Sequence, residues 1–213
     1  MIYYTADWHI NHANIIKYCG RTLFMNDIEL AIYNKLKDKS YSEQKLFKIS
    51  KESVIKMNET LIHNCNERVK EDDWLYFIGD LGFKSGTERG EGEPEKLQKY
   101  IDQLKCKHII WIEGNHDRNG RNSFKTPIQK LIIKQGGKRI CLIHNPEFAD
   151  VNYEINLTAH VHNKWEIMRY RRGMSFTDCI NIGVDVWSFR PVNINEILAR
   201  YSKWLRGQNV KIN

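Results

Sequence analysis

Short apolar runs alternate with amphipathic stretches through the first half of the chain. Residues 2–6, 74–78 and 108–112 are runs of mostly apolar residues, many of them β-branched or aromatic, and such runs are typical of buried strands. Residues 52–69 carry apolar side chains at helical spacing, at positions 54, 57, 61 and 65, which predicts an amphipathic helix. The alternation of strands with helices indicates a sheet covered by helices.

A second helix is predicted between the runs at 74–78 and 108–112. Pro94 stands in its first turn, and four residues at helical spacing form its apolar face: Leu97, Tyr100, Ile101 and Leu104. Residues 84–95 are glycine-rich and polar, so we expect a loop there. A shorter helix is predicted at residues 12–19, because Gly20 follows it and glycine is typical of helix ends.

The second half of the chain consists mostly of short β-prone runs. Residues 131–135 and 138–143 are joined by two glycines, which indicates a hairpin. Three more strands are expected, at residues 157–162, 166–170 and 179–182. Asn193 then opens a C-terminal helix with a sequence close to a capping box. Residues 27–50 interrupt the overall pattern with a polar, lysine-rich segment, which we interpret as a helical insertion in a single domain spanning residues 1–213.

Ligand-type side chains gather where these runs end, and the carboxyl ends of strands are where open α/β sheets usually carry their chemistry. Five segment ends contribute such residues: Asp7, His9, Asp80, Asn115, His116, His144, His160 and His162. Asp7 and His9 lie two residues apart, which in an extended chain places both side chains on one face, where they can hold one ion. The same spacing joins His160 to His162. Carboxylate with imidazole suits Mn, Fe or Zn.

The series DWH, GDLG, GNHD, a single strand-end histidine and HVH resembles the five-motif signature of the calcineurin-like metallophosphoesterases. The resemblance runs from Asp7 to about Pro191, and DWHINHANII and NIGVDVW resemble the small bacterial and phage-type members in particular. Ala159 departs from the pattern, since glycine is usual before the His-x-His pair. We expect metal binding to survive, because alanine costs little unless the backbone needs a positive φ there.

This resemblance implies an α/β fold, a four-layer α/β/β/α sandwich of two mixed sheets flanked by helices. It also implies two divalent metal ions, Mn²⁺ first, with Fe, Zn or Ni as alternatives. Three residues would hold one ion: Asp7, His9 and His162. Three others would hold the second: Asn115, His144 and His160. Asp80 would bridge the two ions.

The implied activity is hydrolysis of a phosphate ester by a metal-bridging hydroxide, with His116 as the general acid that protonates the leaving oxygen. Asp117 would orient an imidazole, or else stabilise the turn. Arg118 would contact phosphate. His12 and Asn14 lie close to the first motif, where they would reach the substrate or only cap the following helix.

Charge bears on the choice of substrate. The chain has 33 Lys and Arg against 26 Asp and Glu, a net charge of +7, which favours a phosphodiesterase acting on nucleotides or nucleic acid. The charge is scattered, so a solvated basic surface is the alternative to a nucleic-acid patch. A phosphomonoesterase is the rival activity. A non-catalytic metal-binding scaffold for a protein partner is the rival class, disfavoured because every implied ligand is present.

The remaining features concern location and accessory residues. Five cysteines without a CxxC pair, and a first strand that begins directly after Met1, predict a cytoplasmic protein without a signal peptide, and no apolar run is long enough for a membrane span. We interpret Asp185 as structural and leave it outside the site. The insertion is expected to act as a lid or a dimer contact.

Overall fold

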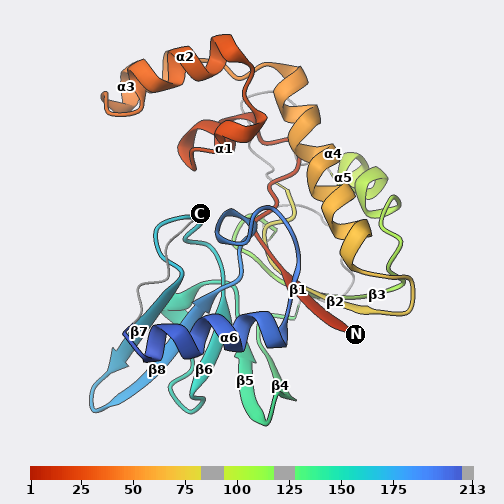
Figure 1. Ribbon diagram of the computed structural model, residues 1–213, viewed down its shortest axis with the longest axis vertical. Helices are drawn as coiled ribbons and strands as arrows, with labels where there is room; N and C mark the ends of the chain where they lie inside the picture. Colours follow the sequence, from red (N-terminus) through yellow and green to blue (C-terminus); the bar gives the residue numbers. More distant parts are fainter. Residues whose placement is uncertain (83–93, 118–127, 208–213) are drawn as a thin grey trace.

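Two mixed β-sheets form the centre of the computed structural model, which describes residues 1–82, 94–117 and 128–207 (Figure 1). The four-stranded sheet has the order β3-β2-β1-β9. Its strands are β1 (Ile2–Thr5), β2 (Trp74–Ile78), β3 (His108–Ile112) and β9 (Val192–Asn193). The first three are parallel and β9 is antiparallel to β1, so β1, β2 and β3 end at the same edge.

The five-stranded sheet has the order β4-β5-β6-β8-β7. Its strands are β4 (Leu131–Gln135), β5 (Lys138–Leu142), β6 (Ile155–Thr158), β7 (Ile167–Arg172) and β8 (Ser175–Asn181). Strands β5, β6 and β8 run parallel, and β4 and β7 are the antiparallel edges. Both sheets therefore offer the carboxyl ends of neighbouring parallel strands.

Alternation along β1 separates two cores. Tyr3 faces the first core, which the four-stranded sheet forms with α4 (Lys51–Arg68) and α5 (Pro94–Ile101). Tyr4 faces the second core, which lies between the two sheets and also takes apolar residues of α6 (Ile194–Leu205). Among the described helices, none is long and apolar enough to cross a membrane.

The segment from residue 27 to residue 50, called the cap below, holds α2 (Asp27–Leu36) and α3 (Tyr41–Leu46). Each helix begins with a capping box, and these local hydrogen bonds explain why a weakly periodic sequence is helical. Figure 1 shows both helices beside α1 (Ala13–Tyr18), at the end of the molecule away from the hairpins. The buried Glu29 carboxylate accepts from Ser50 N, which ties the cap to the start of α4.

The prediction of two mixed sheets flanked by helices is confirmed, and the hairpin and the capped C-terminal helix lie where the sequence predicts them. The strand predicted at 157–162 is wrong, because β6 ends at Thr158 and the chain then turns. Strand β9, only two residues long, has no periodicity that could reveal it. The loop predicted at 84–95 lies outside the described residues except for its last two positions, which begin α5.

Candidate metal centre

Each proposed metal ligand follows the end of a strand. In the four-stranded sheet, β1, β2 and β3 are followed by Asp7, His9, Asp80 and Asn115. In the five-stranded sheet, β5 and β6 are followed by His144, His160 and His162. The structure brings all seven residues together, because the strand ends of the two sheets face the same region.

Backbone turns aim five of these side chains. A positive φ is uncommon outside glycine, yet it occurs at five proposed ligands, with φ between 52° and 71°: Asp7, His9, Asp80, His160 and His162. The expectation that paired ligands share one face of an extended chain is therefore wrong. They converge through left-handed turns. Ala159 is not among the residues with positive φ, which agrees with the expectation that alanine is tolerated there.

The first group of ligands consists of Asp7, His9 and His162, whose ligand atoms lie within 4.8 Å of one another. Asp7 is fully buried, and its Oδ1 has no hydrogen-bond partner within the described part of the chain. Burial raises the pKa of Asp7 and lowers the pKa of His9 well below its usual value. A buried carboxylate oxygen without a donor, beside a neutral imidazole, fits a divalent cation.

The second group consists of Asp80, His144 and His160, again with ligand atoms within 4.8 Å of one another. His144 Nδ1 lies 2.8 Å from the carbonyl oxygen of Ile78, so it donates there, and Nε2 is the nitrogen that can bind a metal ion once its proton has left. That Nε2 lies 3.1 Å from Asn115 Oδ1 and 3.3 Å from Asp80 Oδ2. This arrangement suits a second cation held by His144, Asn115, His160 and Asp80.

Asp80 stands between the two groups. Its Oδ2 lies 3.6 Å from His9 Nε2 in the first group and 3.3 Å from His144 Nε2 in the second. Burial acts to raise the pKa of Asp80, but His144 and the backbone amide of His116 outweigh it and lower the pKa. An ionised carboxylate in this position is within reach of both groups, as a bridging ligand requires.

His116 lies beside the proposed ligands, and its side chain is 33% exposed. Its Nε2 is 3.9 Å from Asp80 Oδ2, and its ring centroid is 5.3 Å from that of His9. Burial lowers the pKa of His116, while the Asp80 carboxylate opposes the shift. The imidazole is thus open to a substrate and close to the place where the two groups meet.

Asp117 connects two turns. Its Oδ2 accepts from the backbone amides of Asp80, at 2.9 Å, and Gly114, at 2.8 Å. A Cβ on Gly114 would lie 2.1 Å from Asp80 Oδ1, so only glycine permits this approach. These contacts agree with the turn-stabilising alternative, and the catalytic role of Asp117 stays a prediction. Arg118 lies outside the described residues.

A cavity of about 790 Å³ opens next to the centre. Its inner wall includes His9, His116 and His162, and its other walls come from α1, the cap and residues 161–164. Both predicted substrate-binding residues, His12 and Asn14, line it. They are therefore placed where a substrate would lie, and contact with substrate stays a prediction.

Two residues that sequence reasoning left out support the centre. Asp185 Oδ2 lies 3.0 Å from His162 Nδ1, so Asp185, which the sequence analysis interprets as structural, supports the orientation of a proposed ligand. The buried Arg21 guanidinium donates to both Asp185 oxygens, at 2.7 and 2.9 Å, and to the carbonyl oxygens of Asp7 and Trp8. A carboxylate shortly after a predicted strand was the available signal for Asp185. The sequence gives no such signal for Arg21, because its partner Asp185 is 164 residues away.

A third set of ligand-type atoms overlaps the first group. Cys19, His162 and Asp185 also place one such atom each within 4.8 Å of one another. The Asp185 carboxylate is already held by two hydrogen bonds from Arg21. We therefore interpret these contacts as support for His162.

Metal binding at neutral pH should release protons. Burial opposes protonation of His144 and His162, but nearby carboxylates outweigh it and raise the pKa of His144 to about 9 and that of His162 to about 11. Both rings are thus protonated at pH 7 in the metal-free protein, and a ligand imidazole must be neutral, so up to about two protons should leave and affinity should fall as the pH falls. Calorimetric titration of metal-stripped protein with Mn²⁺, in two buffers of different ionisation enthalpy, measures this release. Equal heats in both buffers would contradict the prediction.

Comparison with known proteins gives one relative of substantial identity. The uncharacterized protein MJ1445 of Methanocaldococcus jannaschii is 30% identical over 206 residues, which are 95% of this chain and 92% of that protein. No family model matches the chain.

Among solved structures, the protein of unknown function AQ665 from Aquifex aeolicus superposes with a TM-score of 0.53 at 19% identity, over 93% of this chain and 98% of that one. A predicted phosphoesterase from Streptococcus pneumoniae matches over 85% of this chain and 71% of that one, at 14% identity. Its TM-score of 0.30 is too low to support a conclusion. The likeness to AQ665 shows a shared fold.

Proposed function

We propose that this chain, which belongs to the same family as MJ1445, is a calcineurin-like metallophosphoesterase that acts as a dinuclear-metal-dependent phosphodiesterase on nucleotides or nucleic acid. The observation that carries the proposal is the position of Asp80, with one carboxylate oxygen within 3.6 Å of a ligand atom in each group. Two groups that share one carboxylate are suited to two ions held side by side.

The centre would be filled by two divalent cations, Mn²⁺ in the first instance. Asp7, His9 and His162 would hold one of them. Asn115, His144 and His160 would hold the other, with Asp80 shared. Bound there, the ions would supply the Lewis acidity that polarises a phosphate ester and acidifies a water molecule.

The chain's own side chains would then handle the leaving group. His116, partly exposed on the cavity wall, would in its imidazolium form donate a proton to the leaving oxygen as the P–O bond breaks, and would be left as neutral imidazole. Asp117 would keep the turn that carries His116 against the turn that carries Asp80, through its two backbone hydrogen bonds. Asp185 would hold the ring of His162 in its orientation.

A net charge of +7 and the lysines that line the cavity support a nucleotide or nucleic-acid substrate.

We also propose a cytoplasmic location. All five cysteines are buried and free, which suits a reducing compartment.

The function is tested with bis-p-nitrophenyl phosphate and p-nitrophenyl phosphate. Metal-stripped protein should cleave neither, and added Mn²⁺ should restore cleavage of the diester over the monoester. Preference for the monoester would replace the proposed activity with a phosphomonoesterase. If neither substrate is cleaved while two metal ions are bound per chain, the result would favour a non-catalytic metal-binding scaffold over an enzyme.

A further inference from the structure

We propose that the cavity between the metal centre and the cap binds a second phosphate of a phosphorylated nucleoside, and that lysines of the cap and of the loop after β6 select this substrate class. The inference rests on the proposed function, since the scissile phosphate would lie at the metal centre. It adds a specificity site made by residues outside the five motifs.

The cavity is continuous with the centre. His9, His116 and His162 form one wall, and the cap contributes Lys45 and Phe47 to another. A substrate whose phosphate reaches the ligands therefore has the remainder of its structure beside the cap. The volume, about 790 Å³, lies in the range of small-molecule sites, about 300 to 1,000 Å³, so it suits a nucleotide more than a polymer duplex.

Unneutralised positive charge surrounds this space. Lys45, Lys48 and Lys164 line the cavity and are exposed, and none forms an ion pair with any residue that the structure describes. The described lining residues include no carboxylate. Because these ammonium groups are not engaged by the protein, they are available to an anionic group of the ligand.

Hydrogen bonds from α1 hold the cap side of the cavity in place. Lys17 on α1 is buried, and its Nζ donates to the carbonyl oxygens of Gln44, at 3.1 Å, and Phe47, at 2.5 Å. The same Nζ lies 5.9 Å from the centroid of the Phe47 ring. The ammonium group of Lys17 is thus engaged within the protein. Lys45, Lys48 and Lys164 are the lysines of the described lining that can contact a ligand.

Apolar and aromatic groups line the same cavity as the lysines. Tyr18 is 42% exposed and lines the cavity with Ile15, Phe47 and Ile49. An exposed aromatic ring can stack on a base, and stacking tolerates any base because each has a π-face. A metal centre for one phosphate, exposed lysines for another and an aromatic ring in the same cavity match a nucleoside that carries two phosphates.

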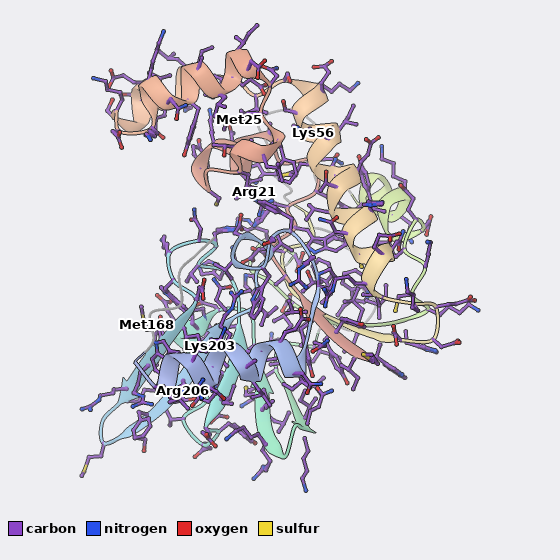
Figure 2. All side chains as sticks on the ribbon, in the orientation of Figure 1. Arg21, Met25, Lys56, Met168, Lys203 and Arg206 are labelled. Atoms are coloured by element: carbon purple, nitrogen blue, oxygen red, sulfur yellow. The ribbon has the colours of Figure 1, made fainter. Side chains whose placement is uncertain are left out.

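The experiment measures binding of thymidine 3′,5′-bisphosphate and thymidine 5′-monophosphate to the Mn²⁺-loaded protein by calorimetry. The bisphosphate should bind about tenfold more tightly, the effect expected of charge-assisted contacts to one added phosphate. The triple variant Lys45→Gln, Lys48→Gln, Lys164→Gln should lose this preference. A matched control, Lys35→Gln, Lys39→Gln, Lys203→Gln, removes the same charge from exposed positions outside the cavity lining and should keep it; Figure 2 shows Lys203 on α6, far from the cap.

Equal affinity for the two nucleotides, or equal loss in both triple variants, would overturn the proposal. An abasic deoxyribose 3,5-bisphosphate that binds as tightly as the thymidine compound would overturn the nucleoside assignment. Hydrolysis is measured separately, on p-nitrophenyl esters of thymidine 5′-phosphate with and without a 3′-phosphate. Lysine-dependent binding without hydrolysis would refute the proposed function alone, whereas hydrolysis without a lysine-dependent preference would refute this inference alone.

Discussion

Replacing Asp80 by asparagine should remove metal from both groups of ligands and reduce turnover of bis-p-nitrophenyl phosphate by about 1,000-fold, because it deletes a carboxylate that lies within reach of both. Lewis-acid stabilisation by metal ions supplies several kcal/mol, and a loss of about 4 kcal/mol corresponds to a rate change of that size. The side-chain shape is nearly unchanged, so the effect would come from lost charge.

Metal content per chain, measured together with turnover, tests this prediction. Asp38→Asn is the matched control, since it removes one carboxylate from an exposed position of the cap. The control should keep both metals and full turnover. Two tightly bound ions in Asp80→Asn would show that Asp80 is not shared between them.

Replacing His116 by alanine should leave metal content unchanged and lower turnover by about 100-fold to 10,000-fold, the usual contribution of a general acid. His116 lies on the cavity wall, outside both ligand groups, which is why metals should remain. The loss should be larger for an ester with a poor leaving group, such as an alkyl ester, than for a p-nitrophenyl ester. A leaving oxygen of low pKa needs little help from an acid.

Linear free-energy analysis over a series of leaving groups measures this difference. His63→Ala serves as the control, because His63 is an exposed histidine on α4. Loss of a metal ion in His116→Ala would mean that His116 is a ligand. A uniform loss over all leaving groups would mean that it does not donate the proton.

Strand-end positions of the ligands can be predicted from sequence because they depend on local patterns. The runs before Asp7, Asp80 and Asn115 are apolar, and each is followed by a polar cluster. Convergence of paired ligands was predicted for the wrong reason. Periodicity describes extended chain, whereas the structure turns at these residues into left-handed conformations. Long-range contacts such as the hydrogen bond from His9 N to Asp80 O stabilise these turns.

Contacts between distant segments could not be predicted either, because local sequence patterns do not report them. Arg21 and Asp185 lie 164 residues apart, and no local pattern links them. The cavity likewise forms because α1 and the cap pack beside the centre. This packing depends on hydrogen bonds from Lys17 on α1 to the carbonyl oxygens of Gln44 and Phe47 in the cap. A single sequence shows that Lys45 and Lys48 are basic, but not that they face the same space as His116.

The division of ligands between the sheets limits how this protein can be engineered. Each group contains ligands from both sheets. In the first group, His162 follows a strand of the five-stranded sheet, whereas Asp7 and His9 follow a strand of the four-stranded sheet. In the second group, Asn115 follows a strand of the four-stranded sheet and His144 follows a strand of the five-stranded sheet. A fragment cut between β3 and β4 would therefore retain no complete half of the centre, and grafting any one motif onto a foreign scaffold would transfer at most a pair of ligands. The smallest transferable unit is therefore both sheets together.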